Sequence, residues 1–147
     1  MHFADVARRY CDWAEGQPAA PREDMRRAQT LLAELHLAIL HLPNDAAETE
    51  TTDDSLTSTD WKKVSGRFQH LPIRGYWDVF NPLEEEAPVF NTLWDDLTDI
   101  WRDLKEGLVL YDRGQLAEAV CEWRVNFEIH WGQHLTGAQR AIHAYFS

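Results

Sequence analysis

Apolar residues recur at steps of three and four along most of the chain, which is the spacing of one face of an α-helix. A first amphipathic helix is expected to end near Gly16, and its apolar face consists of Phe3, Val6, Tyr10 and Trp13. A second helix is expected to begin at Pro21, because proline suits a first helical position, and to stop before Pro43. Its apolar face consists of Met25, Ala28, Leu32, Leu35 and Ile39.

Three further helical stretches follow. A short one is expected to begin at Thr59 or Asp60 and to end at Pro72. The next has Thr92 as its N-cap candidate and Gly114 as its C-terminal stop, with an apolar face formed by Leu93, Leu97, Ile100, Leu104, Leu108 and Tyr111. The last runs from Leu116 to Tyr145, and Gly132 inside it marks a kink or a break between two helices. The chain is therefore predicted to be all-α, a compact bundle of about five helices in a single domain over residues 1–147.

Two connecting segments differ from this pattern. Residues 43–58 are polar and acidic, and they predict a solvated loop that is a candidate mobile segment. Residues 72–92 contain Gly75 and three prolines, so an irregular, aromatic-rich connection is expected there, with room for a short extended stretch over residues 73–80. Loops of this kind often form binding sites, which makes Tyr76, Trp77 and Phe80 a candidate binding surface.

The charge of the chain limits its partners. The formal net charge is −11; residues 76–147 carry five Lys or Arg against thirteen Asp or Glu. A negative field repels phosphate groups, so we expect no binding to nucleic acid or to anionic membrane surfaces, and a protein partner, if present, would be basic. The N-terminal residues do not resemble a signal peptide and no apolar run is long enough to span a membrane, so a cytoplasmic location is expected.

Two histidines carry the main candidate chemistry. His130 and His134 lie one turn apart within the apolar face of the last helix, and four-residue spacing places both imidazoles on one side of it. Such a pair can chelate a divalent metal, act as a general base or respond to pH. The alternative is that both histidines are core residues that hydrogen-bond to a neighbouring helix.

The preceding helix offers carboxylates to this pair. Asp96 and Asp103 flank its leucine face and are the candidate metal ligands to join His130 and His134. They could instead pair with Arg124 or Arg140, or orient one of the histidines. Asp95, Asp99 and Glu106 point away from the leucine face and are expected to face water, and His36 is expected at the rim of the second helix.

No catalytic motif accompanies these residues. The chain has no nucleophile elbow, phosphate loop or dinucleotide fingerprint. The first interpretation is therefore a non-enzymatic binding or protein-interaction module with no bound cofactor. The second is a metal-binding protein or metal-dependent enzyme that uses the paired histidines. The third is an acidic inhibitor of a basic protein.

Three segments carry a resemblance to a known family: GYWDVFNPLEEEAPV, LWDDLTDIWRDLKEGLVLYDRG and EWRVNFEIHWGQHLTGAQRAIHAYF. With them, the chain resembles the bacterial family catalogued as domain of unknown function 5063, most specifically in HWGxHxxxAxRAxH from His130 to His143. The resemblance implies a compact helical domain in cytosolic bacterial proteins and implies no activity, cofactor or site residue. The chain is also similar to metal-binding DinB-like four-helix bundles, in one HxxxH pair and the expected bundle alone.

Overall fold

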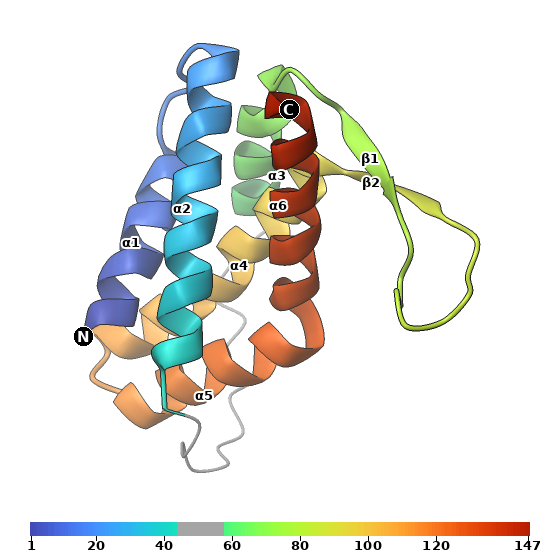
Figure 1. Ribbon diagram of the computed structural model, residues 1–147. Helices are drawn as coiled ribbons and strands as arrows, with labels where there is room; N and C mark the ends of the chain where they lie inside the picture. Colours follow the sequence, from blue (N-terminus) through green and yellow to red (C-terminus); the bar gives the residue numbers. More distant parts are fainter. Residues whose placement is uncertain (44–57) are drawn as a thin grey trace.

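The computed structural model describes residues 1–43 and 58–147. The predicted acidic loop over residues 43–58 therefore lies almost wholly outside the described residues. The helical bundle is confirmed (Figure 1). The elements are α1 His2–Glu15, α2 Pro21–His41, α3 Ser58–Arg67, the 3₁₀ turn η1 Phe68–His70, β1 Gly75–Asp78, β2 Val89–Thr92, α4 Leu93–Asp112, α5 Leu116–Asn126, the π-helical turn η2 Phe127–Trp131, and α6 Gly132–Phe146.

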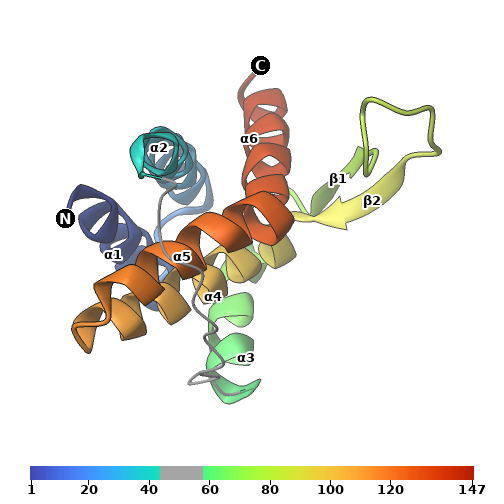
Figure 2. The same ribbon diagram turned by 90° about the horizontal axis from the view of Figure 1, so that it is seen from below.

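Helix α4 lies at the centre of the bundle. It packs against α1, α3, α5 and α6, while α2 packs against α1 and α6. Its predicted apolar face is buried, from Leu93 through Leu97, Ile100 and Leu104 to Leu108. Seen from below, α5 folds back along α4 before the chain turns into α6 (Figure 2). The face of α4 that meets α6 is the part of the fold that carries the candidate site.

The last helical stretch is broken where the sequence places Gly132. Helix α5 ends at Asn126, a π-helical turn follows, and α6 begins at Gly132. A Cβ at position 132 would overlap the carbonyl oxygen of Phe127, so glycine permits the close approach of the chain in this turn. π-Helical turns inside helices occur frequently at functional sites, and this one contains His130.

The connection before α4 is more regular than predicted. Strands β1 and β2 form an antiparallel hairpin in which Tyr76 pairs with Asn91 and Trp77 with Phe90. Each strand has only four residues, too few for alternation of apolar and polar positions to stand out in the sequence. Strand β1 lies within the extended stretch expected over residues 73–80, whereas β2 was not predicted.

Three aspartates are buried among the described residues, and their partners differ. Asp24 accepts hydrogen bonds from Arg67 and from the indole nitrogen of Trp13 at 3.0 Å, which ties α1, α2 and α3 together. Burial alone would raise the pKa of Asp24, but these hydrogen bonds and the charge of Arg67 lower it. The other two, Asp96 and Asp103, lie on α4 and have no arginine partner of this kind.

The described helices contain no membrane-spanning candidate, because none is both long and apolar enough to cross a bilayer.

Substitution of two glycines by alanine, one in α4 and one in α3, tests the packing around α4. A methyl group on Gly107 would overlap the indole of Trp123, which is fully buried and donates a hydrogen bond to the carbonyl of Leu104. Gly107→Ala is expected to lower the free energy of unfolding by about 1–3 kcal/mol, because the indole has no room to move. Gly66 in α3 has open space around it, so Gly66→Ala should raise stability by about 0.5 kcal/mol. Urea unfolding measures both, and equal effects would contradict this packing.

Candidate metal centre

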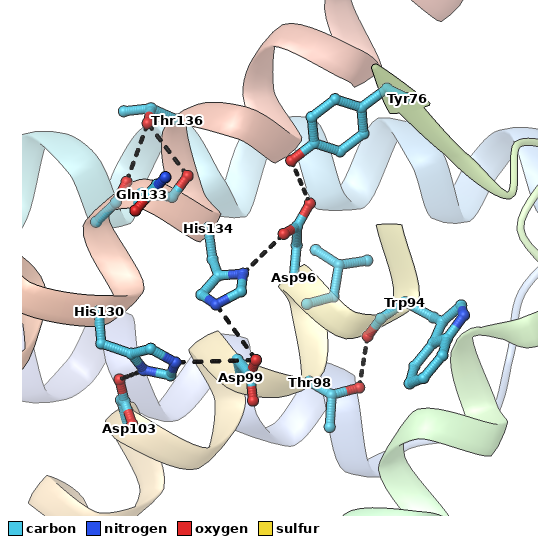
Figure 3. Close-up of polar contacts among 12 residues, drawn as sticks. Tyr76, Trp94, Asp96, Thr98, Asp99, Asp103, His130, Gln133, His134 and Thr136 are labelled. Atoms are coloured by element: carbon cyan, nitrogen blue, oxygen red, sulfur yellow. Dashed lines mark hydrogen bonds and ion pairs between the residues drawn. The ribbon is translucent and has the colours of Figure 1, made fainter. Parts of the chain in front are cut away.

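Helix α4 presents three aspartates to the last helical stretch. Asp96, Asp99 and Asp103 are separated by three and four residues, the spacing that places side chains on one face of a helix. All three lie opposite the segment that contains His130 and His134 (Figure 3). The site therefore lies at the α4–α6 contact predicted from the sequence.

Each histidine uses its Nδ1 atom to bind a different buried carboxylate. Nδ1 of His130 lies 2.6 Å from Oδ2 of Asp103, and Nδ1 of His134 lies 2.7 Å from Oδ1 of Asp96. An ionised carboxylate only accepts hydrogen bonds, so Nδ1 carries the proton in both contacts. Both rings are thereby held with the opposite nitrogen, Nε2, directed away from these carboxylates.

The hairpin supplies a third contact to this network. The Tyr76 hydroxyl of β1 donates a hydrogen bond of 2.7 Å to the second oxygen of Asp96 (Figure 3). Gly137 of α6 makes room for it, since a Cβ at that position would overlap the hydroxyl. Both oxygens of Asp96 are thus satisfied inside the protein, as a buried carboxylate requires.

The two Nε2 atoms converge on Asp99. Oδ2 of Asp99 lies 3.3 Å from Nε2 of His134 and 3.9 Å from Nε2 of His130. The three ligand atoms all lie within 4.8 Å of one another. The other oxygen of Asp99, Oδ1, lies 3.5 Å from the guanidinium of Arg102. Asp99 is therefore held between a cation on its own helix and the two imidazoles.

The sequence-based expectation for Asp99 was wrong. It was expected to face water, yet its side chain is 13% exposed and contacts both histidines. Asp96 and Asp103 contact the histidines as expected, and both contacts are made at Nδ1. Among the roles considered for these two aspartates, this contact is the one that orients a histidine. His36 lies outside the site, where its Nδ1 is 3.2 Å from Oε1 of Gln139.

The three residues of the candidate binding surface do not all lie on the surface of the hairpin. Trp77 and Phe80 are exposed, whereas Tyr76 is directed inward to Asp96.

The spacing signal that could have identified Asp99 is its position between Asp96 and Asp103, three and four residues from them. The inward direction of Tyr76 has no comparable signal, because it follows from the strand register.

Burial and charge raise the pKa values of Asp96, Asp103 and His134. Burial raises the pKa of Asp96 and Asp103, and the hydrogen bonds from the histidines only partly oppose it. Burial alone would lower the pKa of His134, but the hydrogen bond to Asp96 and the charges of Asp96 and Asp99 raise it above its ordinary value. In the absence of a metal, His134 therefore holds its second proton to a higher pH than an exposed histidine.

The ring orientations predict an unusual tautomer. In the metal-free protein, neutral His130 and His134 should both carry their proton on Nδ1, because that atom donates to a buried carboxylate. Long-range ¹H–¹⁵N NMR, recorded at a pH where the ¹⁵N shifts show both rings to be neutral, distinguishes the Nδ1–H tautomer from the Nε2–H tautomer. Exposed His143 should show the Nε2–H form that prevails in water. Nε2–H resonances from His130 and His134 would contradict the geometry.

Comparisons with known proteins agree with the fold and indicate no activity. The structure is similar to the crystal structure of protein BF1032 from Bacteroides fragilis, with a TM-score of 0.77 and 20% sequence identity over 97% of this chain and 88% of that one. A search of curated proteins gives no match. The family model described as domain of unknown function (DUF5063) matches residues 1–147. The chain therefore belongs to the DUF5063 family.

Proposed function

We propose that this protein binds one divalent transition-metal ion through Asp99, His130 and His134. The observation that carries the proposal is the convergence of three electron-pair donors. With Nδ1 protonated on both neutral rings, each Nε2 presents a lone pair to Oδ2 of Asp99. Three acceptors facing one another repel unless a cation lies between them.

A proton satisfies this arrangement only in part. An extra proton on Nε2 of His134 can bind Asp99 at 3.3 Å, but the 3.9 Å from His130 is too long for a hydrogen bond. A metal ion serves all three atoms at once. Zinc–nitrogen and zinc–oxygen bonds of about 2.1 Å separate tetrahedral ligand atoms by about 3.4 Å, so small side-chain movements close the site.

The surrounding carboxylates support this reading. Histidines that bind metals usually donate their other ring N–H to a carboxylate, which fixes the tautomer and raises the basicity of the ligand. Here Asp103 serves His130 in this way and Asp96 serves His134, with Tyr76 holding Asp96. Arg102 holds the free oxygen of Asp99. Both histidine ligands are thus oriented by buried carboxylates, and Asp99 has an ion pair with Arg102 at 3.5 Å.

The donor set and its exposure indicate the kind of metal site. Two imidazoles and one carboxylate suit Zn²⁺ or Fe²⁺ rather than Mg²⁺ or Ca²⁺, which prefer oxygen. Three protein ligands leave positions open, and the side chains of His130 and His134 are 33% and 22% exposed, so water reaches the site. A metal bound there would lower the pKa of its water or polarise a substrate oxygen. The site is therefore of the catalytic type, and metal-assisted hydrolysis is the function it fits best.

Metal titration of matched variants tests the proposal. Calorimetry with Zn²⁺ on chelator-treated protein should give one site per chain. Asp99→Asn, His130→Gln and His134→Gln should each abolish measurable binding, because each removes a ligand. Asp96→Asn should weaken binding by about 10–100-fold, since it removes only the group that orients His134. Asp112→Asn, at the exposed C-terminal end of the same helix, serves as the control and should bind like the parent chain.

Two outcomes would contradict the ligand assignment. Parent-like binding by both histidine variants would place any metal elsewhere. A larger loss from Asp96→Asn than from Asp99→Asn would make Asp96 the ligand, as the sequence had predicted. Circular dichroism and melting temperatures of each variant separate loss of the site from loss of the fold.

A further inference from the structure

The β1–β2 hairpin carries large apolar side chains that the described part of the chain leaves uncovered. Five of them form what we call the hairpin patch: Trp77, Phe80, Leu83, Val89 and Phe90. Trp77 is 71% exposed and Leu83 92%. Single exposed apolar residues are common, but five of them on one projecting hairpin, two with their rings in contact, mark an interaction surface. Figure 1 shows the hairpin extending away from the helices.

An aromatic pair stands at the centre of the patch. Trp77 and Phe90 are directly opposite each other in the strand register, and their ring centroids are 5.4 Å apart. Tryptophan is among the residues that contribute most to binding energy at protein interfaces. Neighbouring Tyr76 points to the opposite side of β1, toward α4, so the pair is turned away from the metal centre.

The hairpin is held firmly enough to present this pair. At its root the Tyr76 hydroxyl binds Asp96, and the amide of Leu93 donates to the carbonyl of Arg74 at 2.9 Å. Farther out, the side chain of Gln133 on α6 donates to the carbonyl of Phe80 at 3.2 Å. Little conformational entropy is therefore lost at the strands when a partner binds.

The tip adds negative charge to the apolar patch. Residues 75–92 contain four carboxylates and no lysine or arginine. Glu86 accepts a hydrogen bond from the amide of Asn81 within the turn, whereas Glu84 and Glu85 are exposed and form no ion pair with other described residues. An apolar anchor on the same hairpin as these exposed carboxylates complements a surface that combines an apolar pocket with lysine or arginine.

We propose that the hairpin patch docks on a basic protein, with Trp77 and Phe90 inserted into an apolar pocket and Glu84 and Glu85 paired with its cations. A second copy of the chain would bring the same carboxylates to the contact, and like charges facing each other cost binding energy. Nucleic acids and anionic membranes are disfavoured by the same negative charge. This surface is separate from the metal ligands and does not depend on the proposed metal.

A peptide selection tests both halves of the proposal. The probe is a phage-displayed library of random peptides, and enriched sequences are synthesised and titrated by fluorescence anisotropy. Enriched peptides should combine apolar residues with lysine or arginine. Trp77→Ala and Phe90→Ala should each weaken binding by about tenfold or more, because they remove the anchor. Glu84→Gln with Glu85→Gln should weaken it less, and added salt should abolish that difference.

Matched controls decide the outcome. Leu37→Ala with Leu40→Ala removes two exposed leucines from α2 and should leave the affinity unchanged. Circular dichroism and melting temperatures of the hairpin variants should match those of the parent chain, which shows that the variants are folded. Enriched peptides without basic residues, or affinities that the hairpin variants do not change, would overturn the proposal. So would a dimer in sedimentation velocity that Trp77→Ala dissociates, since the patch would then bind a second copy.

Discussion

The burial of two carboxylates on α4 constrains the rest of this structure. Asp96 and Asp103 are 3% and 5% exposed, and a buried carboxylate without hydrogen-bond donors would destabilise the fold by several kcal/mol. The donors come from elements that are distant in sequence: His130 in η2, His134 in α6 and, for Asp96, Tyr76 in β1. The need to satisfy these two side chains therefore fixes how the last helix and the hairpin lie on α4.

The same constraint prepares the site for a cation. Because the carboxylates occupy Nδ1 of both rings, the Nε2 atoms turn toward Asp99, and three donor atoms meet at a solvent-accessible point. Asp24 makes an instructive comparison, because Arg67 satisfies its buried charge and the neighbouring His70 has each ring nitrogen 2.8 Å from an oxygen, Nε2 from Asp24 and Nδ1 from the carbonyl of Arg67. At the α4–α6 contact, by contrast, each histidine binds a carboxylate through Nδ1 and keeps Nε2 available on the side of Asp99.

The sequence predicted the helices well and the site in part. Apolar spacing identified the buried face of α4 and the break at Gly132, because both are local properties of a helix. His130 and His134 were identified because four-residue spacing fixes their common face. The choice among aspartates was different, since helix periodicity alone does not tell which carboxylate meets Nδ1 and which meets Nε2. That choice depends on the angle between α4 and α6 and on the π-helical turn, and neither is encoded in a local pattern. Strand β2 and its pairing with β1 were missed because strands of four residues are too short to show alternation.

The most direct test of the metal centre is the anomalous diffraction of crystals grown with zinc, recorded on both sides of the zinc absorption edge. The account predicts one anomalous peak per chain, about 2.1 Å from Nε2 of His130, Nε2 of His134 and an oxygen of Asp99, with Asp96 and Asp103 still bound to Nδ1. A peak coordinated by Asp96 or Asp103, or crystals in which zinc binds only elsewhere on the surface, would contradict it.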